Sequence, residues 1–493
     1  MNIKEAKAQI ADTVRAYLAK DAEGMPLIPV EKQRPILLMG PPGIGKTAIM
    51  EQIAKEMQIN LVSYTITHHT RQSAIGLPFI SKRNYGGKET SVTEYTMSEI
   101  IADVYDRIEL SGIAEGILFL DEINCVSETL APTMLQFLQY KTFGSHRVPD
   151  GFVIVTAGNP PEYNASVRDF DIVTLDRVRL IEVEADLAAW RGYALSATVH
   201  GAVTAYLEIR KEHFYAIRMT PEGKRFVTAR GWEDLSRVMT VHEEKGLAVN
   251  RALIRQFLQD EEIADAFCTY YELWNKYKSL YDVPGILAGQ TPDDETKTAL
   301  QRAPFDEKLS LLSLLADAIA GDCREWRKHY AEAIAVRDVL RVIREGTESP
   351  GEDCTEEIAQ AAALLQQTLT KKEQARLIDD REAYVTRGVI GALHEAAAQG
   401  ASFASVREWF AKREEARAEG AAQTDIRMTH AFSFLSGVFG EGQELVLYLT
   451  RLSAGEDTLS FVTEYGNDAY TRYAKLLLVD ETREQLTREL LAI

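Results

Sequence analysis

"GPPGIGKT", residues 40–47, matches the pattern G-x-x-x-x-G-K-[ST] and lies between an apolar run, "PILLMG" (35–40), and a helical pattern, "TAIMEQIAKEM" (47–57). The glycines let the backbone curl so that successive N–H groups point at one anion, and the following helix adds the positive end of its dipole. A glycine-rich turn with a chance lysine is the alternative, but it would not require this strand and this helix. We expect a loop that binds nucleotide phosphates, formed by Gly40, Pro41, Pro42, Gly43, Ile44, Gly45, Lys46, Thr47 and Ala48.

Catalytic and metal-binding groups are expected in this loop and after a second strand. Lys46 would reach the β- and γ-phosphates of ATP, and the Thr47 hydroxyl would bind Mg²⁺. "GILFLDEIN" (116–124) is an apolar strand that ends in two carboxylates, and ligands of parallel sheets lie at the carboxyl ends of strands. We therefore expect Asp121 to hold Mg²⁺ and Glu122 to deprotonate the attacking water. Without the phosphate loop, the same pair would be interpreted as a solvated strand end.

A third apolar strand, "FVIVTAGNPPEYN" (152–164), is followed by another polar side chain, Asn159. An amide at this place can bridge the γ-phosphate and the attacking water. The alternative is a residue that forms an Asx-turn before Pro160. Because Asn159 follows a strand expected beside the one that carries Glu122, we predict the bridging role.

Strand-like and helix-like patterns alternate over residues 1–190, which predicts an α/β domain with a mainly parallel sheet. After residue 185 the patterns are helical. A segment rich in Pro, Gly and Asp, 281–305, indicates a boundary, and "EEARAEGAAQTD" (414–425) indicates a solvated turn. The expected strands are continuous apolar runs, typical of strands buried on both faces, at 35–40, 60–66, 116–122 and 152–159, with 181–184 as a fifth.

Composition excludes several classes of protein. The formal charge of −19 over 493 residues argues against sequence-independent binding of nucleic acid, so a DNA translocase is disfavoured. No apolar run approaches the roughly 20 residues of a membrane span, and no signal-like segment opens the chain, so we expect a cytoplasmic protein. The four cysteines never form CxxC and are expected to be free thiols: Cys125, Cys268, Cys323 and Cys354.

The order of these motifs resembles that of the AAA+ ATPases, over roughly residues 1–280, and "DEIN" (121–124) with "GNP" (158–160) resembles the MoxR branch of chaperone-like bacterial ATPases. The resemblance implies an α/β P-loop AAA+ core with a parallel sheet and an α-helical lid. Together with the helical pattern of the remaining chain, it gives three domains: the nucleotide-binding core (1–185), the lid (186–285) and an α-helical C-terminal domain of unknown role (306–493).

The resemblance also implies two hairpin inserts, near residues 68–99 and 140–152. The first is expected to turn at "NYGG" (84–87), where Tyr85 is a candidate contact for a substrate protein. An aromatic residue in a hairpin more often packs against its cross-strand neighbours, and this alternative stays open.

Two arginines receive roles from the same resemblance. Arg177 in "LDRV" (175–178) matches an arginine finger that reaches the γ-phosphate bound by a neighbouring subunit, and Arg179 is the alternate. Relatives usually have Phe where this chain has Val178. The alternative without a catalytic role is that Arg177 forms a surface ion pair with Asp169 or Asp171.

Arg230 in "TARGWEDL" (228–235) resembles a second sensor at the start of a lid helix, although relatives often have Pro where this chain has Ala229. Such an arginine would bring a further positive charge to the nucleotide. The alternative is an ion pair with Glu233.

Taken together, these features predict Mg²⁺-dependent ATP hydrolysis by a homo-oligomeric ring that remodels or activates a protein partner. The resemblance implies six subunits in the ring. Relatives often act with a protein that carries a von Willebrand factor A domain, so such a partner is expected here from the resemblance alone. A nucleotide-gated assembly scaffold with incidental turnover is the alternative. Glu122 and Arg177 argue against it, because a scaffold needs neither a base nor a finger.

Overall fold

The computed structural model describes residues 1–68, 76–127, 129–143, 145–163, 167, 170–220, 223–346, 355–374, 377–378, 380–398 and 403–475. Contacts within the chain define two compact units. The first consists of Met1–Ala189 with Gln366–Ala383, and the second of Trp190–Leu365 with Tyr384–Ile493. The division into core, lid and C-terminal domain stays a prediction.

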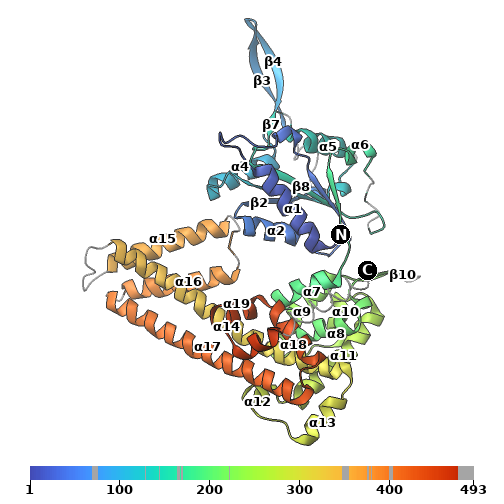
Figure 1. The fold of residues 1–493 in the computed structure, drawn as a ribbon. Coiled ribbons are helices and arrows are strands. Elements are labelled where there is room, and N and C mark those ends of the chain that lie inside the picture. Colours follow the sequence, from blue (N-terminus) through green and yellow to red (C-terminus); the bar gives the residue numbers. More distant parts are fainter. Residues whose placement is uncertain are drawn as a thin grey trace, which may run out of the picture. The chain divides into compact units, whose positions relative to one another are not determined.

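A five-stranded parallel sheet forms the centre of the first unit, with the strand order β2-β5-β8-β1-β9 (Figure 1). This confirms the predicted α/β class. The fifth strand begins two residues before the predicted 181–184, because Arg179 pairs with Ile36. The strands are β1 (Ile36–Met39), β2 (Asn60–Thr65), β5 (Gly116–Asp121), β8 (Phe152–Gly158) and β9 (Arg179–Glu182).

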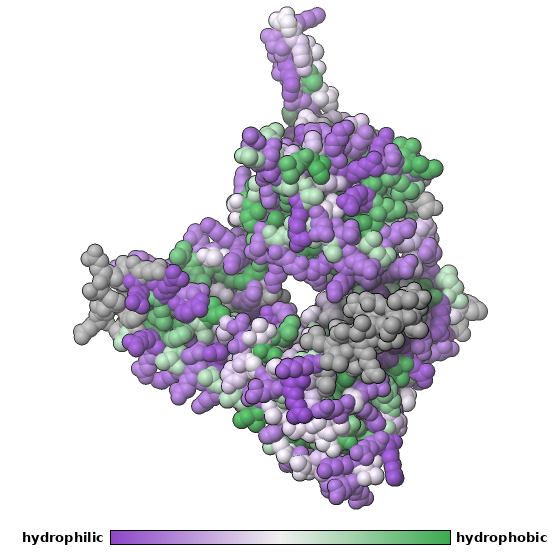
Figure 2. Space-filling model, viewed as in Figure 1, coloured by the Kyte–Doolittle hydropathy of each residue, from purple (hydrophilic) through white to green (hydrophobic). Residues whose placement is uncertain are grey.

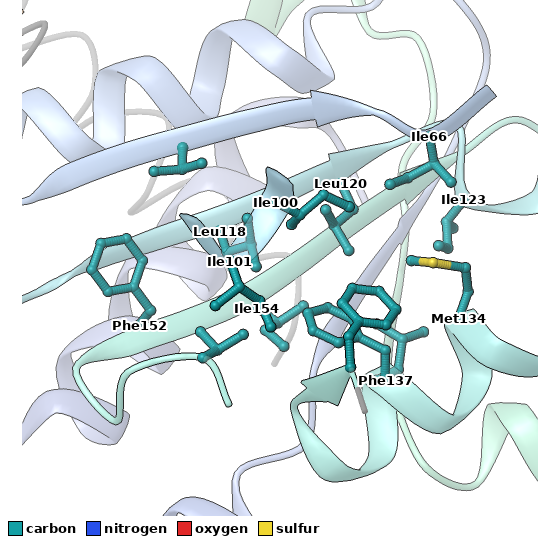
Figure 3. Packing of buried hydrophobic residues seen from close by; sticks show 14 of the residues in the cluster. Ile66, Ile100, Ile101, Leu118, Leu120, Ile123, Met134, Phe137, Phe152 and Ile154 are labelled. Atoms are coloured by element: carbon teal, nitrogen blue, oxygen red, sulfur yellow. The ribbon is translucent and has the colours of Figure 1, made fainter. Parts of the chain in front are cut away.

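Helices cover both faces of this sheet, as the continuous burial of its central strands requires. Leu118 and Leu120 of β5 point to one face, where they join a buried apolar cluster with α4 (Glu99–Ser111) and α5 (Ala131–Tyr140), as Figure 3 shows. Ile117 and Phe119 alternate with them and are equally buried on the other face. On that side α1 (Ile3–Leu18) and α2 (Lys46–Met57) contact the strands.

Two hairpins leave the core of the first unit at the predicted inserts. β3 (Pro78–Tyr85) pairs with β4 (Lys88–Tyr95), and β6 (Thr142–Phe143) pairs with β7 (His146–Arg147). The longer hairpin turns at Gly86 and Gly87, which both have positive φ, and it extends away from the sheet in Figure 1. Short elements complete the unit: η1 (Val30–Lys32), η2 (Ile66–His68), η3 (Ile123–Cys125) and α6 (Ile172–Leu175).

The second unit is mainly helical. Its helices are α7 (Leu187–Ser196, which begins in the first unit), α8 (Gly201–Ile209), η4 (Lys211–His213), α9 (Ala229–Glu244), α10 (Arg251–Phe257), α11 (Glu261–Leu280), α12 (Val283–Leu287), α13 (Asp294–Arg302), α14 (Phe305–Gly346), α15 (Thr355–Gln374, which ends in the first unit), α16 (Asp380–Ala398, which begins in the first unit), α17 (Phe403–Phe439), α18 (Gln443–Ala454) and α19 (Glu456–Glu464). A hairpin, β10 (Ala216–Thr220) with β11 (Gly223–Val227), interrupts the predicted run of helices.

The solvated turn predicted at 414–425 is wrong, because α17 runs through this segment. Its Glu, Ala and Arg residues favour a helix, and Gly420 costs too little to end one. The aromatic residues of 267–281 belong to the core: Phe267, Tyr270, Tyr271, Trp274, Tyr277 and Tyr281 are all buried.

Three of the four cysteines, Cys125, Cys268 and Cys323, lie in the described part of the chain and are free thiols. None of the helices that the structure describes combines the length and the apolar character needed to cross a membrane.

Candidate functional site

The predicted phosphate loop joins β1 to α2. Gly43 and Gly45 have φ of 74° and 94°, a left-handed conformation that side chains rarely adopt, and Gly45 is the N-cap of α2. Gly40 is needed for a different reason, because a Cβ there would lie 2.7 Å from the carbonyl oxygen of Val183. The loop therefore curls tightly at the N-terminus of a twelve-residue helix, where an anion is stabilised.

Lys46 connects this loop to the end of β8. Its Nζ donates hydrogen bonds of 2.8 Å to the carbonyl oxygens of Gly40 and Pro41 and to Oδ1 of Asn159. The lysine is buried. The structure thus brings together two residues that are 113 positions apart and that the sequence assigns to the same phosphate group.

The two carboxylates at the end of β5 lie beside the first turn of α2. Thr47 Oγ1 donates a 3.1 Å hydrogen bond to Oδ2 of Asp121, and Oδ1 of Asp121 accepts one from the Glu122 backbone at 2.9 Å. Hydroxyl and carboxylate oxygens are the hard ligands that Mg²⁺ prefers, usually together with water and phosphate oxygens. Thr47 and Asp121 therefore fit the predicted metal site.

Glu122 has an unusual backbone conformation, with φ 56° and ψ 36°. Non-glycine residues in this region cost of order 1–3 kcal/mol and are concentrated at functional sites. Its carboxylate is held by a residue that sequence reasoning missed, since Thr67 Oγ1 donates a 3.1 Å hydrogen bond to Oε2 of Glu122. Thr67 follows β2, the neighbour of β5 in the sheet.

Asn124 is a second residue of the site to which sequence reasoning assigned no role. Its Nδ2 donates a 2.8 Å hydrogen bond to the backbone carbonyl of Asn159, while its Oδ1 is buried without a hydrogen-bond partner in the described structure. Gly158 makes room for it, because a Cβ there would lie 2.6 Å from Oδ1 of Asn124. The loops that follow β5 and β8 are therefore tied together.

Arg177 and Arg179 lie at the other edge of the sheet. β9 runs parallel to β1, and Arg179 pairs with Ile36 at the start of β1, whereas the phosphate loop follows Met39 at its end. Both arginines are exposed. Within the described part of the chain Arg177 has no ion-pair partner within 4 Å, so its predicted alternative pair with Asp171 is not formed. Asp169 lies outside the described residues.

Asp171 is the N-cap of the short helix α6, which precedes Arg177. Its carboxylate accepts a 2.7 Å hydrogen bond from the Thr174 backbone, and the contacts with Thr174 lower the pKa of Asp171, with a smaller contribution from the charge of Arg177. The same helix exposes Ile172 and Val173, with 85% and 54% of their surface accessible. Figure 2 shows apolar surface near α6. An arginine beside exposed apolar residues is typical of a protein interface.

Arg230 belongs to the second unit, near the start of α9, whose N-cap is Thr228. It is exposed. The predicted alternative, an ion pair with Glu233, is not formed in the described structure, where Glu233 accepts hydrogen bonds from Tyr193 and Arg237 instead. Its role at the nucleotide stays a prediction.

Tyr85 is at the tip of the longer hairpin and is 57% exposed, so it does not pack as a buried cross-strand residue. Most of the surface of this hairpin is polar in Figure 2, with a few apolar side chains near its base. The position suits a contact with another protein, and that role stays a prediction.

Residues 36–174 match the family model of the ATPase family associated with various cellular activities (AAA). This part of the chain is therefore similar to an AAA domain. The match contains the phosphate loop, Asp121, Glu122 and Asn159, and it ends before Arg177. This domain supports nucleotide binding and ATPase activity in general. No curated protein matches the chain.

Proposed function

We propose that the chain is a Mg²⁺-dependent ATPase of the MoxR type that works as an oligomeric ring and remodels or activates a protein partner. One observation carries the ATPase part: Lys46, the Thr47–Asp121 pair and Glu122 meet at the carboxyl edge of the sheet, next to Asn159. The two hairpins support the MoxR part, since they occupy the positions of the family's inserts.

Each of these residues at the carboxyl edge of the sheet has a defined role in the proposed reaction. Lys46 exchanges its carbonyl contacts for phosphate oxygens, and the loop amides bind the remaining phosphate charge. Thr47 and Asp121 hold Mg²⁺, which supplies positive charge to the phosphate oxygens when bound. Glu122 accepts a proton from the attacking water, while the hydrogen bond from Thr67 to Oε2 orients its carboxylate.

Arg177 acts on the nucleotide of a neighbouring subunit in this proposal. The register of β9 against β1 supports this, because it keeps Arg177 away from the phosphate loop of its own domain. Ile172 and Val173 would be covered by the neighbour. Head-to-tail contacts of this kind close into rings. An arginine finger supplied in this way contributes about 10³–10⁵ to the rate where fingers have been measured.

The finer parts of the proposal rest on the family resemblance. They are the lid role of Arg230, a subunit number of six, a cytoplasmic location and a partner with a von Willebrand factor A domain. The exposed Tyr85 at the hairpin tip supports contact with a partner but does not distinguish one partner from another.

Steady-state ATP turnover of the native chain, Lys46→Ala and Glu122→Gln tests the ATPase part directly. We expect Mg²⁺-dependent turnover by the native chain and a fall of about 10²–10⁴-fold in Glu122→Gln with ATP binding retained. Lys46→Ala should lose binding as well. If the native chain binds ATP but gives negligible turnover with and without added partner proteins, the assembly-scaffold alternative is favoured instead.

A further inference from the structure

The second unit contains a cavity of about 600 Å³ that none of the proposed ATPase steps uses. It lies between α8, α9 and α11 on one side and α14, α18 and α19 on the other, all outside the AAA match. Its volume is within the usual range of small-molecule sites, which is roughly 300–1,000 Å³.

Asp317 of α14 faces this cavity beside an aromatic ring. Gly201, the first residue of α8, brings the two together, since a Cβ there would lie 1.8 Å from Oδ2 of Asp317 and 3.1 Å from the ring of Trp274. Only glycine leaves room for both groups at this point. A carboxylate and an aromatic ring in contact with the same backbone position form one wall of the cavity.

Of the two acids that line the cavity, Glu243 has partners in the described structure and Asp317 has none. Among the described residues it makes no hydrogen bond or ion pair, whereas Glu243, the other acid of the lining, accepts hydrogen bonds from His200 at 3.0 Å and Lys278 at 2.9 Å. The cations near Asp317 are also held elsewhere. Arg451 donates to Ser313 and Thr204 and lies 3.9 Å from Glu208, and Arg324 lies 3.4 Å from Asp457.

The surroundings of Asp317 make its charge costly. The side chain is accessible to water inside the cavity, but the helices around it remove it from bulk solvent, and this burial raises the pKa of its carboxyl. The charge of Arg451 opposes the shift without cancelling it. An acid whose charge is disfavoured by its surroundings, and which has no hydrogen-bond or ion-pair partner among the described residues, is a candidate for binding a ligand of opposite charge.

We propose that this cavity binds a small organic cation, with an ammonium or guanidinium group against Asp317 and an apolar body against the aliphatic wall. A carboxylate accepts charge-assisted hydrogen bonds from such a group. Leu195, Val199, Leu314 and Leu452 supply the aliphatic wall. A metal ion does not fit, because the described residues contain no group of three His, Cys, Asp or Glu side chains that could hold one.

Calorimetric titration of the full chain with phenethylamine, agmatine and spermidine tests the proposal. Phenethyl alcohol and 3-phenylpropionate serve as the neutral and anionic analogues. We expect at least one amine to bind with Kd below about 1 mM. Asp317→Asn should weaken that binding by about tenfold or more, while Asp322→Asn should not change it. Asp322 is the matched control, since it is on the same helix but pairs with Arg427 and does not line the cavity.

Thermal unfolding of the same variants separates a ligand site from a structural acid. Asp317→Asn should unfold at the native temperature or above it, because it removes a charge that its surroundings disfavour and that has no partner among the described residues. A clear fall in that temperature assigns Asp317 a structural role and overturns the proposal. The proposal is also overturned if none of the three amines binds. It is overturned as well if Asp317→Asn binds the amine as tightly as the native chain does, or if the native chain binds phenethyl alcohol as tightly as the amine.

Discussion

Asn124 links the loop that carries the proposed base to the loop that carries Asn159, through the 2.8 Å hydrogen bond to the Asn159 carbonyl. Replacing Asn124 with Ala removes this bond and should let the amide of Asn159 move relative to Lys46. We expect kcat for ATP hydrolysis to fall about tenfold, the effect of losing one hydrogen bond of about 1.4 kcal/mol in the transition state. ATP affinity should change little, because the side-chain hydrogen bond of Asn124 in the described structure goes to Asn159 and not to the phosphate loop.

The matched control is Asn84→Ala, which removes an exposed asparagine from the long hairpin. Its basal kcat should equal that of the native chain. Unchanged kcat in Asn124→Ala, measured beside this control, would contradict the positioning role.

For single residues, the sequence was sufficient to place polar side chains that come shortly after a strand. Lys46, Asp121 and Asn159 could be placed together because the carboxyl ends of parallel strands meet at one edge. Thr67 and Asn124 could not, since their partners are set by how two loops approach each other. A polar residue shortly after each strand was the only signal, and such residues are also ordinary in turns.

At the scale of elements, α17 continues through a segment whose composition indicates a turn. Gly420 is exposed in this helix, and a Cβ built there meets no atom within 4 Å. Gly420→Ala should therefore stabilise the second unit by about 0.5–1 kcal/mol, since alanine loses less backbone entropy in a helix. Chemical unfolding followed by circular dichroism measures the change.

Gly112→Ala is the control, and we expect it to have the opposite effect on stability. Gly112 ends α4 with φ 71°, so alanine is strained there and should destabilise the first unit. A destabilising Gly420→Ala would contradict the continuous helix.

Lys141 at the end of α5 gives a pH test of the first unit. Its Nζ is buried and donates a 3.1 Å hydrogen bond to Gln33, and burial lowers its pKa to about 8. The unfolded chain binds this proton more tightly than the folded one, so the lysine's contribution to stability rises as pH increases from about 8 to about 10.4. The native chain should gain up to about 3 kcal/mol relative to Lys141→Met over this range.

The unfolding free energies of both proteins, measured at pH 7, 8, 9 and 10, provide the test. A difference that stays constant with pH would show that Lys141 keeps an ordinary pKa, and a difference of opposite sign would contradict the burial argument.

Most of the elements could be predicted from apolar periodicity, and the exceptions have physical causes. The strands of the sheet are continuous apolar runs, which few other structures produce. The β10–β11 hairpin is short, largely exposed and rich in charge, so it lacks that pattern. In 414–425 the helix-forming Glu, Ala and Arg residues outweigh the glycine and the aspartate, which alone suggest a turn.

At the scale of the whole molecule, the account depends on a site shared between subunits. Arg177 is exposed, follows the exposed apolar residues Ile172 and Val173, and lies at the sheet edge opposite the phosphate loop. Turnover per subunit should therefore rise with protein concentration as the ring assembles. Arg177→Ala should lose about 10³-fold in kcat and Arg179→Ala should lose much less, if Arg177 is the finger. No sequence pattern of a single chain could have shown this sharing directly.

Mixing two inactive variants tests the central claim most directly. Arg177→Ala keeps its own Glu122, and Glu122→Gln keeps its own Arg177, so an interface between one subunit of each kind contains a complete site. In an equal mixture that reassembles at random, about a quarter of the interfaces are complete, and we predict ATP turnover of about a quarter of the native value. If the mixture stays as inactive as its components while gel filtration shows mixed oligomers, the finger does not act between subunits and the account is contradicted.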